Sequence, residues 1–172
     1  MAAKNTSRNA RPGARPAARG RRPAAVAPHA LLLAVQRADG DAGLPVRATL
    51  RRWVRAALER DARVTLRFVG AREARALNRA YRGRDYATNV LTFVYDSGDP
   101  VEGDIVVCVP VVRREARAQR KAPRAHLAHM VVHGVLHLQG HEHERDADAA
   151  SMEARETAIL RGLRYPDPYA AR

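Results

Sequence analysis

The segment between Pro123 and Gly140 constrains the fold most strongly, because it carries both a helix start signal and a helix stop signal. Proline is favoured at the first position of a helix, and glycine is favoured just after its end. Within such a helix His133 and His137, four residues apart, lie on the same face one turn apart. We therefore expect a helix over this segment that presents two imidazoles on one face.

The rest of the chain shows apolar patterns typical of alternating strands and helices. Alternating or β-branched runs predict strands over 30–35, 64–68, 88–95 and 104–109. Helical spacing predicts helices over 45–60, 71–82 and 110–121, and a last helix from Asp146 onward. A turn is expected over 39–43, and Gly83 is expected to end the second helix. This order predicts a single α+β domain over residues 30–168, with helices packed around a four-stranded mixed sheet.

The N-terminal segment has a composition unlike the rest. Residues 1–29 are rich in Ala, Arg and Pro and contain seven basic residues and no acid. Such a segment buries too little apolar surface to fold, so we expect a disordered basic tail. The residues leave open an RNA-tethering arm, a passive extension or an organelle transit segment.

The charge balance points to a polyanionic partner. The formal net charge is +13 and the pI is near 11.3, and basic surfaces bind nucleic acid through the release of counterions. Cys108 is the single cysteine, which excludes an intrachain disulfide and a cysteine-rich zinc site. A single cysteine fits a cytosolic or matrix compartment, and we expect a cytoplasmic protein. No apolar run approaches the roughly 20 residues needed to span a bilayer, so no membrane association is expected.

A third histidine completes a candidate metal site. The chain can turn back after Gly140 and bring His143 to the point where His133 and His137 meet, in the pattern H-x3-H-x5-H. Three neutral imidazoles on one Zn²⁺ leave one coordination position open, as catalytic zinc sites require. Two alternatives stay open: His141 in place of His143, and a set shifted to include His129. His126 and His129 otherwise suit surface or packing positions.

The residue after the first histidine argues against one class of zinc enzyme. A zinc peptidase helix carries a glutamate there as general base, and this chain has Gly134. The peptidase hypothesis is therefore weakened, although hydrolysis of another substrate is compatible with the site because zinc itself activates water.

Three stretches resemble the YbeY family of rRNA maturation factors, regarded as metal-dependent endoribonucleases. The first is His133-Gly-Val-Leu-His-Leu-Gln-Gly-His-Glu-His143, similar to the family signature H-G-x-L-H-L-x-G-[YH]-D-H. The second is Leu77-Asn-Arg-Ala-Tyr-Arg-Gly-Arg-Asp-Tyr-Ala-Thr-Asn-Val-Leu-Thr-Phe93, and the third is Gly103-Asp-Ile105. They occur in the family's order and cover about residues 31–165. Glu142 departs from the pattern, because the family usually has Asp there.

The resemblance implies one zinc ion held by His133, His137 and His143, and a functionally important arginine at Arg82. It implies hydrolysis of single-stranded RNA, maturation of the 3′ end of small-subunit rRNA, ribosome quality control, and the small ribosomal subunit as partner. A planar guanidinium can grip phosphate through two parallel bonds; the alternative for Arg82 is a surface ion pair with Asp85. Two rival functions remain: a non-catalytic RNA-binding assembly factor with a structural zinc, and a zinc hydrolase of another substrate. The oligomeric state is not predicted.

Overall fold

The structure is a computed structural model, and it describes residues 28–38, 43–141 and 146–170. These residues form four strands and five helices in the predicted order. The strands are β1 (Leu31–Arg37), β2 (Ala62–Val69), β3 (Val90–Asp96) and β4 (Val101–Cys108). The helices are α1 (Arg47–Ala57), α2 (Ala71–Arg82), α3 (Val109–Ala118), α4 (Pro123–Leu138) and α5 (Asp146–Gly162).

The strands form one mixed sheet in the order β1-β2-β4-β3. β1, β2 and β4 run parallel, with Leu33 opposite Val64 and Leu66 opposite Ile105. β3 pairs antiparallel with β4 at the edge of the sheet, and a register shift interrupts that pairing between Val94 and Asp96. Both parallel pairs are joined through helices, as parallel strands require.

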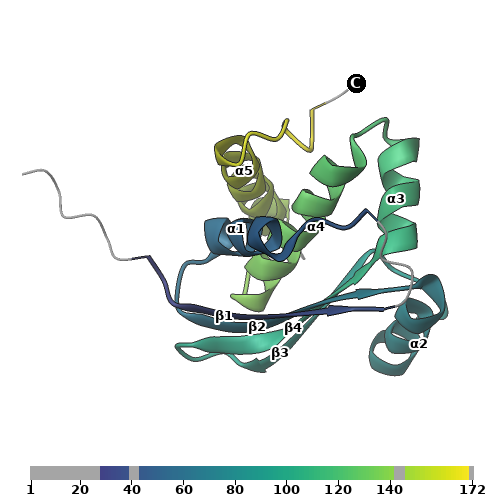
Figure 1. Cartoon of the computed structure of the whole chain (residues 1–172), viewed down its shortest axis with the longest axis horizontal. Helices are drawn as coiled ribbons and strands as arrows, with labels where there is room; N and C mark the ends of the chain where they lie inside the picture. Colours follow the sequence, from purple (N-terminus) through teal and green to yellow (C-terminus); the bar gives the residue numbers. More distant parts are fainter. Residues whose placement is uncertain (1–27, 39–42, 142–145, 171–172) are drawn as a thin grey trace, which may run out of the picture.

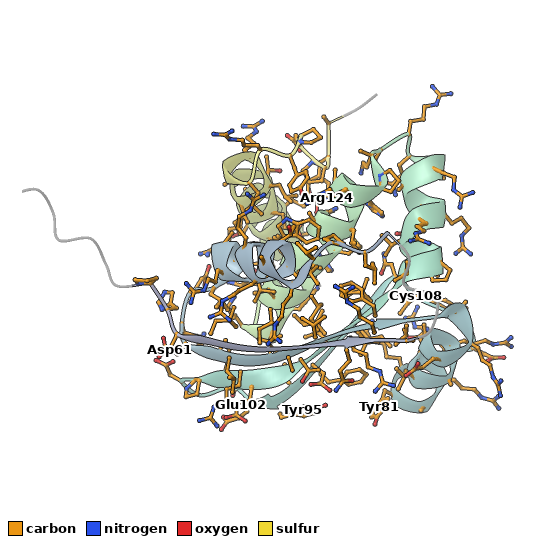
Figure 2. The ribbon with its side chains drawn as sticks, in the orientation of Figure 1. Asp61, Tyr81, Tyr95, Glu102, Cys108 and Arg124 are labelled. Carbon is orange, nitrogen blue, oxygen red and sulfur yellow. The ribbon has the colours of Figure 1, made fainter. Side chains whose placement is uncertain are left out.

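The helices form unequal layers on the two faces of the sheet. Helices α1, α4 and α5 lie on one face, and α2 lies on the other near the end of β4 (Figure 1). Part of the second face is left to polar and aromatic side chains, among them Tyr95 and Glu102 (Figure 2). The main apolar core therefore lies between the sheet and the α1–α4 layer.

Helix α4 is the centre of that core. It packs against α1, α3, α5 and the strands β3 and β4, and its buried residues lie on all sides, including Val131, Val132 and Leu136. A helix that is apolar all round is expected to be an interior helix. This position fixes the helix rotation, and with it the direction in which His133 and His137 point.

The predicted domain class is confirmed, and the boundaries differ slightly. α1 covers Arg47–Ala57 rather than 45–60, because Leu58 adopts an extended backbone and ends it. β3 begins at Val90, two residues later than predicted, since Thr88 and Asn89 belong to the preceding connection. Residues 1–27 of the predicted basic tail and residues 39–42 of the predicted turn lie outside the described residues. Among the helices of the described ranges, none combines the length and apolarity needed to cross a bilayer.

Candidate metal centre

Two imidazoles on α4 face each other across one helical turn. The Nε2 atoms of His133 and His137 are 3.1 Å apart, and both side chains are partly exposed. Two nitrogens bound tetrahedrally to one zinc ion, each at ~2.0–2.1 Å, lie about 3.3 Å apart. The separation of this pair is therefore close to that of two ligands of one ion, so the donor set fits the predicted metal. The third predicted ligand, His143, lies outside the described residues.

Glu156 on α5 accepts a hydrogen bond from the other ring nitrogen of His133. His133 Nδ1 lies 2.7 Å from Glu156 Oε1, and the Glu156 side chain is fully buried. A carboxylate can only accept, so Nδ1 carries the proton and donates it. That tautomer leaves the lone pair of Nε2 directed toward His137, which is the form a metal ligand needs.

Glu156 accepts from two further groups. His129 Nε2 lies 3.1 Å from Glu156 Oε2, and the Tyr169 hydroxyl donates to the same oxygen. Burial opposes ionisation of Glu156, yet these hydrogen bonds from His129, His133 and Tyr169 together lower its pKa to about 2. In turn, burial and then the Glu156 carboxylate raise the pKa of Tyr169. Glu156 is therefore a buried carboxylate ion stabilised by three donors.

Three other histidines, His126, His129 and His141, each form a hydrogen bond with a carboxylate. His126 Nε2 lies 2.9 Å from Glu115 Oε2, and His141 Nε2 lies 3.0 Å from Glu59 Oε2. His129 bonds Glu156 as described. His141 thus has Glu59 as its partner.

The described residues contain a second possible ligand set. One nitrogen each of His129 and His133 and one oxygen of Glu156 lie within 4.8 Å of one another, so this buried cluster could hold a metal ion. It shares His133 with the first set but would use the opposite ring nitrogen. Because Nδ1 of His133 and Nε2 of His129 already donate to Glu156, an ion there would have to displace both protons.

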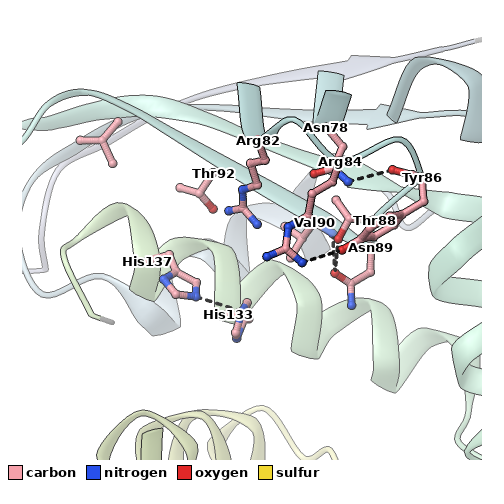
Figure 3. Close-up of a pocket in the computed structure, with 11 residues that line it drawn as sticks. Asn78, Arg82, Arg84, Tyr86, Thr88, Asn89, Val90, Thr92, His133 and His137 are labelled. Atoms are coloured by element: carbon pink, nitrogen blue, oxygen red, sulfur yellow. Dashed lines mark hydrogen bonds between the residues drawn. The ribbon is translucent and has the colours of Figure 1, made fainter. Parts of the chain in front are cut away.

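The His133–His137 pair opens into a cleft of about 720 Å³. The cleft lies between α4, β3 and the end of α2 (Figure 3). Its lining is rich in polar and basic side chains: Asn78, Arg82, Arg84, Tyr86, Thr88, Asn89, Val90, Thr92, Val94, His133 and His137. None of the described lining residues is acidic, so the cleft suits an anion.

Arg82 lies in this cleft, and its guanidinium extends toward α4 (Figure 3). The alternative, an ion pair with Asp85, is wrong. Asp85 accepts from Arg75 instead, with Nε to Oδ1 at 2.8 Å and Nη2 to Oδ2 at 2.6 Å. Among the described residues no carboxylate pairs with Arg82, which leaves its donors available to a phosphate.

The packing around Gly134 explains why no glutamate follows His133 in this chain. A Cβ at this position would lie 2.6 Å from Ile105 Cγ2 on β4, and Ile105 is fully buried. The position after His133 therefore faces the sheet and has no room for a side chain. Thr92 on β3 also donates to the Gly134 carbonyl, at 3.4 Å, so helix and sheet touch here.

Sequence reasoning missed Glu156 and Tyr169. Both reach the site through tertiary packing: Glu156 bonds His133, 23 residues away along the chain, and Tyr169 bonds Glu156. One signal was available: Met152, Glu156, Leu160 and Leu163 recur at helical spacing, and all four are buried. A lone acid on the apolar face of a helix predicts a buried charge with partners.

Comparisons with known proteins agree with these features. Residues 41–164 match the family model described as Endoribonuclease YbeY. The protein named Endoribonuclease YbeY from Cupriavidus necator is 58% identical over 147 residues, covering 83% of this chain and 74% of that protein. Its namesake from Thiobacillus denitrificans is 59% identical over 141 residues, covering 81% of this chain and 96% of that protein.

A solved structure supports the fold. The solution structure of TM1509 from Thermotoga maritima superposes with a TM-score of 0.52 at 24% identity, covering 82% of this chain and 99% of the other. The family match spans α1 to α5 and includes the histidine helix, the cleft and Arg82. On this similarity the chain belongs to the YbeY family of endoribonucleases.

Proposed function

We propose that this protein is a zinc-dependent endoribonuclease that cuts single-stranded RNA and acts in the cytoplasm on the small ribosomal subunit. Within that role we assign it to maturation of the 3′ end of the small-subunit rRNA and to ribosome quality control. The observation that carries the proposal is the His133–His137 pair, with Nε2 atoms 3.1 Å apart, opening into a cleft shared with Arg82.

We assign one zinc ion to His133, His137 and His143 rather than to the Glu156 cluster. Nitrogen donors suit zinc, and Glu156 is already satisfied by three hydrogen-bond donors. In this assignment Glu156 orients His133 instead of binding the ion. When bound, the ion supplies a Lewis acid that polarises a phosphoryl oxygen and promotes ionisation of water.

The residues of the chain supply binding and charge compensation. Arg82 can donate two parallel hydrogen bonds to the scissile phosphate and offset the charge that grows on it during cleavage. The cleft has no acidic lining among the described residues, which favours an RNA backbone over an acidic peptide. Gly134 removes the helix-borne base of zinc peptidases, so a peptide substrate is disfavoured.

The test is cleavage of an end-labelled single-stranded RNA by zinc-loaded wild type, chelator-treated wild type and His137→Ala. We expect cutting by the first alone, with zinc content by mass spectrometry falling in the other two. His141→Ala is the matched control, because His141 bonds Glu59 rather than the pair, and it should keep both zinc and activity.

Two outcomes would redirect the assignment. RNA binding without cutting by fully loaded wild type, on naked RNA and on small subunits, would favour the alternative of an assembly factor with a structural zinc. Full activity in a verified zinc-free His137→Ala protein would exclude the metal-dependent mechanism.

A further inference from the structure

The connection between α2 and β3, residues 83–89, has no regular secondary structure but is anchored at both ends. Gly83 turns the chain with a φ of 67°. The buried side chain of Asn78 then donates from Nδ2 to the Tyr86 carbonyl at 2.8 Å. At the far end the Cys108 amide donates to the Asn89 carbonyl at 2.8 Å. Residues 84–88 are therefore held in place before any ligand binds.

A third contact directs the side chains of this segment. Arg75 on α2 donates twice to Asp85, which lowers the pKa of that carboxyl. Asp85 lies with Arg75 and Arg79 on the outer side of α2, whereas its neighbours Arg84 and Tyr86 line the cleft (Figure 3). The single acid of the segment is thereby kept out of the cleft.

Arg84 and Tyr86 touch each other within the cleft. Arg84 Nη1 donates to the Tyr86 hydroxyl at 3.2 Å, and Tyr86 is 52% exposed. A guanidinium has five N–H donors, and no carboxylate among the described residues pairs with Arg84. The pair therefore presents an accessible ring beside an uncompensated positive charge, in the cleft that holds His133 and His137.

This combination matches one feature of single-stranded RNA. An unpaired nucleotide offers a flat base that stacks on aromatic rings and a phosphate that binds arginine. The neighbouring amide of Asn89 is already used, because Oδ1 accepts from the Val90 amide at 2.7 Å and Nδ2 donates to Glu115 at 3.2 Å. Asn89 is thus not free to read a base edge, which favours stacking without sequence selection.

We propose that Arg84 and Tyr86 form a nucleotide-binding subsite beside the metal centre, in which Tyr86 stacks a base and Arg84 binds the adjoining phosphate. The subsite rests on the proposed function, since it places an RNA chain in the same cleft. It positions the strand so that the next phosphate lies between Arg82 and the two histidines.

The test measures binding of the zinc-loaded chain to a fluorescent RNA hexamer whose 2′-hydroxyls are methylated, with intact RNA ends verified after each titration. Tyr86→Ala should weaken binding at least about fivefold, the lower end for loss of one stacked base. Tyr86→Phe should stay within about twofold of wild type, because the ring remains. Equal melting temperatures of wild type, Tyr86→Ala and Tyr86→Phe would show that weaker binding comes from lost stacking and not from unfolding.

A second arm replaces bases of the hexamer one at a time by abasic sites. One abasic position should weaken binding to wild type as much as Tyr86→Ala does, and should have no further effect on Tyr86→Ala. Additive losses at every position would overturn the stacking role. This comparison depends on the RNA rather than on the stability of a variant.

The phosphate role of Arg84 is read from salt dependence. Arg84→Gln should reduce the slope of log K against log salt concentration by about 0.7, the contribution of one phosphate contact on a single strand. Arg52→Gln is the matched control, because Arg52 is exposed on α1 outside the cleft, and it should leave the slope closer to wild type. An unchanged slope in Arg84→Gln would overturn the assignment.

The outcomes also separate the subsite from the proposed function. If wild type binds and cuts RNA and both Tyr86→Ala and Arg84→Gln bind RNA as wild type does, the proposed subsite is wrong but the proposed function stands. If wild type binds neither the hexamer nor cleavable RNA, both the subsite and the proposed function are wrong.

Discussion

Glu156 Oε1 lies 2.7 Å from His133 Nδ1, on the opposite side of the ring from the nitrogen that faces His137. One imidazole thus connects a buried carboxylate on α5 to the cleft. Burial opposes the ionisation of Glu156, but hydrogen bonds from His129, His133 and Tyr169 lower its pKa to about 2, so the carboxylate accepts from His133 Nδ1 and keeps the proton there.

Replacing Glu156 by Gln removes the charge with little change in shape. We expect zinc affinity to fall roughly 10- to 100-fold, the usual effect of losing a carboxylate that orients a ligating histidine. Competition with a fluorescent chelator measures this. Glu153→Gln, an exposed acid on the same helix, is the control and should bind zinc like wild type. Zinc retained by His137→Ala but lost from Glu156→Gln would instead place the ion at the His129–His133–Glu156 cluster.

Arg82→Ala should reduce RNA cleavage on the order of 100- to 1,000-fold, as expected for loss of a donor that stabilises transition-state charge. Arg82→Lys should restore little of this, because an ammonium cannot form two parallel bonds to phosphate. Zinc content should not change. Arg79→Ala, on the outer side of α2 near Asp85, is the matched control. Equal losses in the two alanine variants would argue for a general charge effect instead.

Gly134→Ala should destabilise the fold by about 1–3 kcal/mol, the range for overpacking a tight interior. The new methyl would lie 2.6 Å from Ile105 Cγ2, which outweighs the gain in helix propensity of about 1 kcal/mol. Urea unfolding measures the difference. Gly162→Ala at the end of α5 has no atom within 4 Å of its new methyl. It should be neutral or stabilising, and a similar loss there would contradict the packing argument.

Stability should also depend on pH through His126. Burial lowers the pKa of His126 below its ordinary 6.5, so the unfolded chain takes up the proton at a higher pH than the folded one. The contribution of His126 is therefore fully present above pH 6.5 and is lost as the pH falls from there through the folded pKa.

Urea midpoints measured in excess chelator at pH 7.5 and 5.5 test this for wild type and His126→Gln. The variant should lose less stability between the two pH values, because Gln does not titrate. The same decline in both proteins would mean that other groups carry the pH dependence.

Local sequence patterns were sufficient for the element order. Pro123 and Gly140 bracket α4, and the alternation at Val64, Leu66 and Phe68 marks β2. The observed boundaries differ from the predicted ones by two or three residues where a change of backbone conformation ends an element, as at Leu58. That His133 and His137 face each other followed from helical geometry alone, since an i, i+4 pair must share a face.

The parts of the site that come from distant segments could not be predicted in this way. The partners of Glu156 lie on α4 and beyond α5, and the choice of Arg75 rather than Arg82 by Asp85 depends on how residues 83–89 fold back on α2. Such choices depend on tertiary packing, which sequence spacing does not encode.

The contact of Gly134 with β4 also bears on redesign. Replacing Gly134 by glutamate would not convert this scaffold into a peptidase, because the carboxylate would have to enter the sheet. Rotating α4 to make room would turn His133 and His137 away from the cleft. An engineer seeking a new base in this enzyme should therefore graft it onto β3, at Thr92 or Val94, whose side chains already border the cleft.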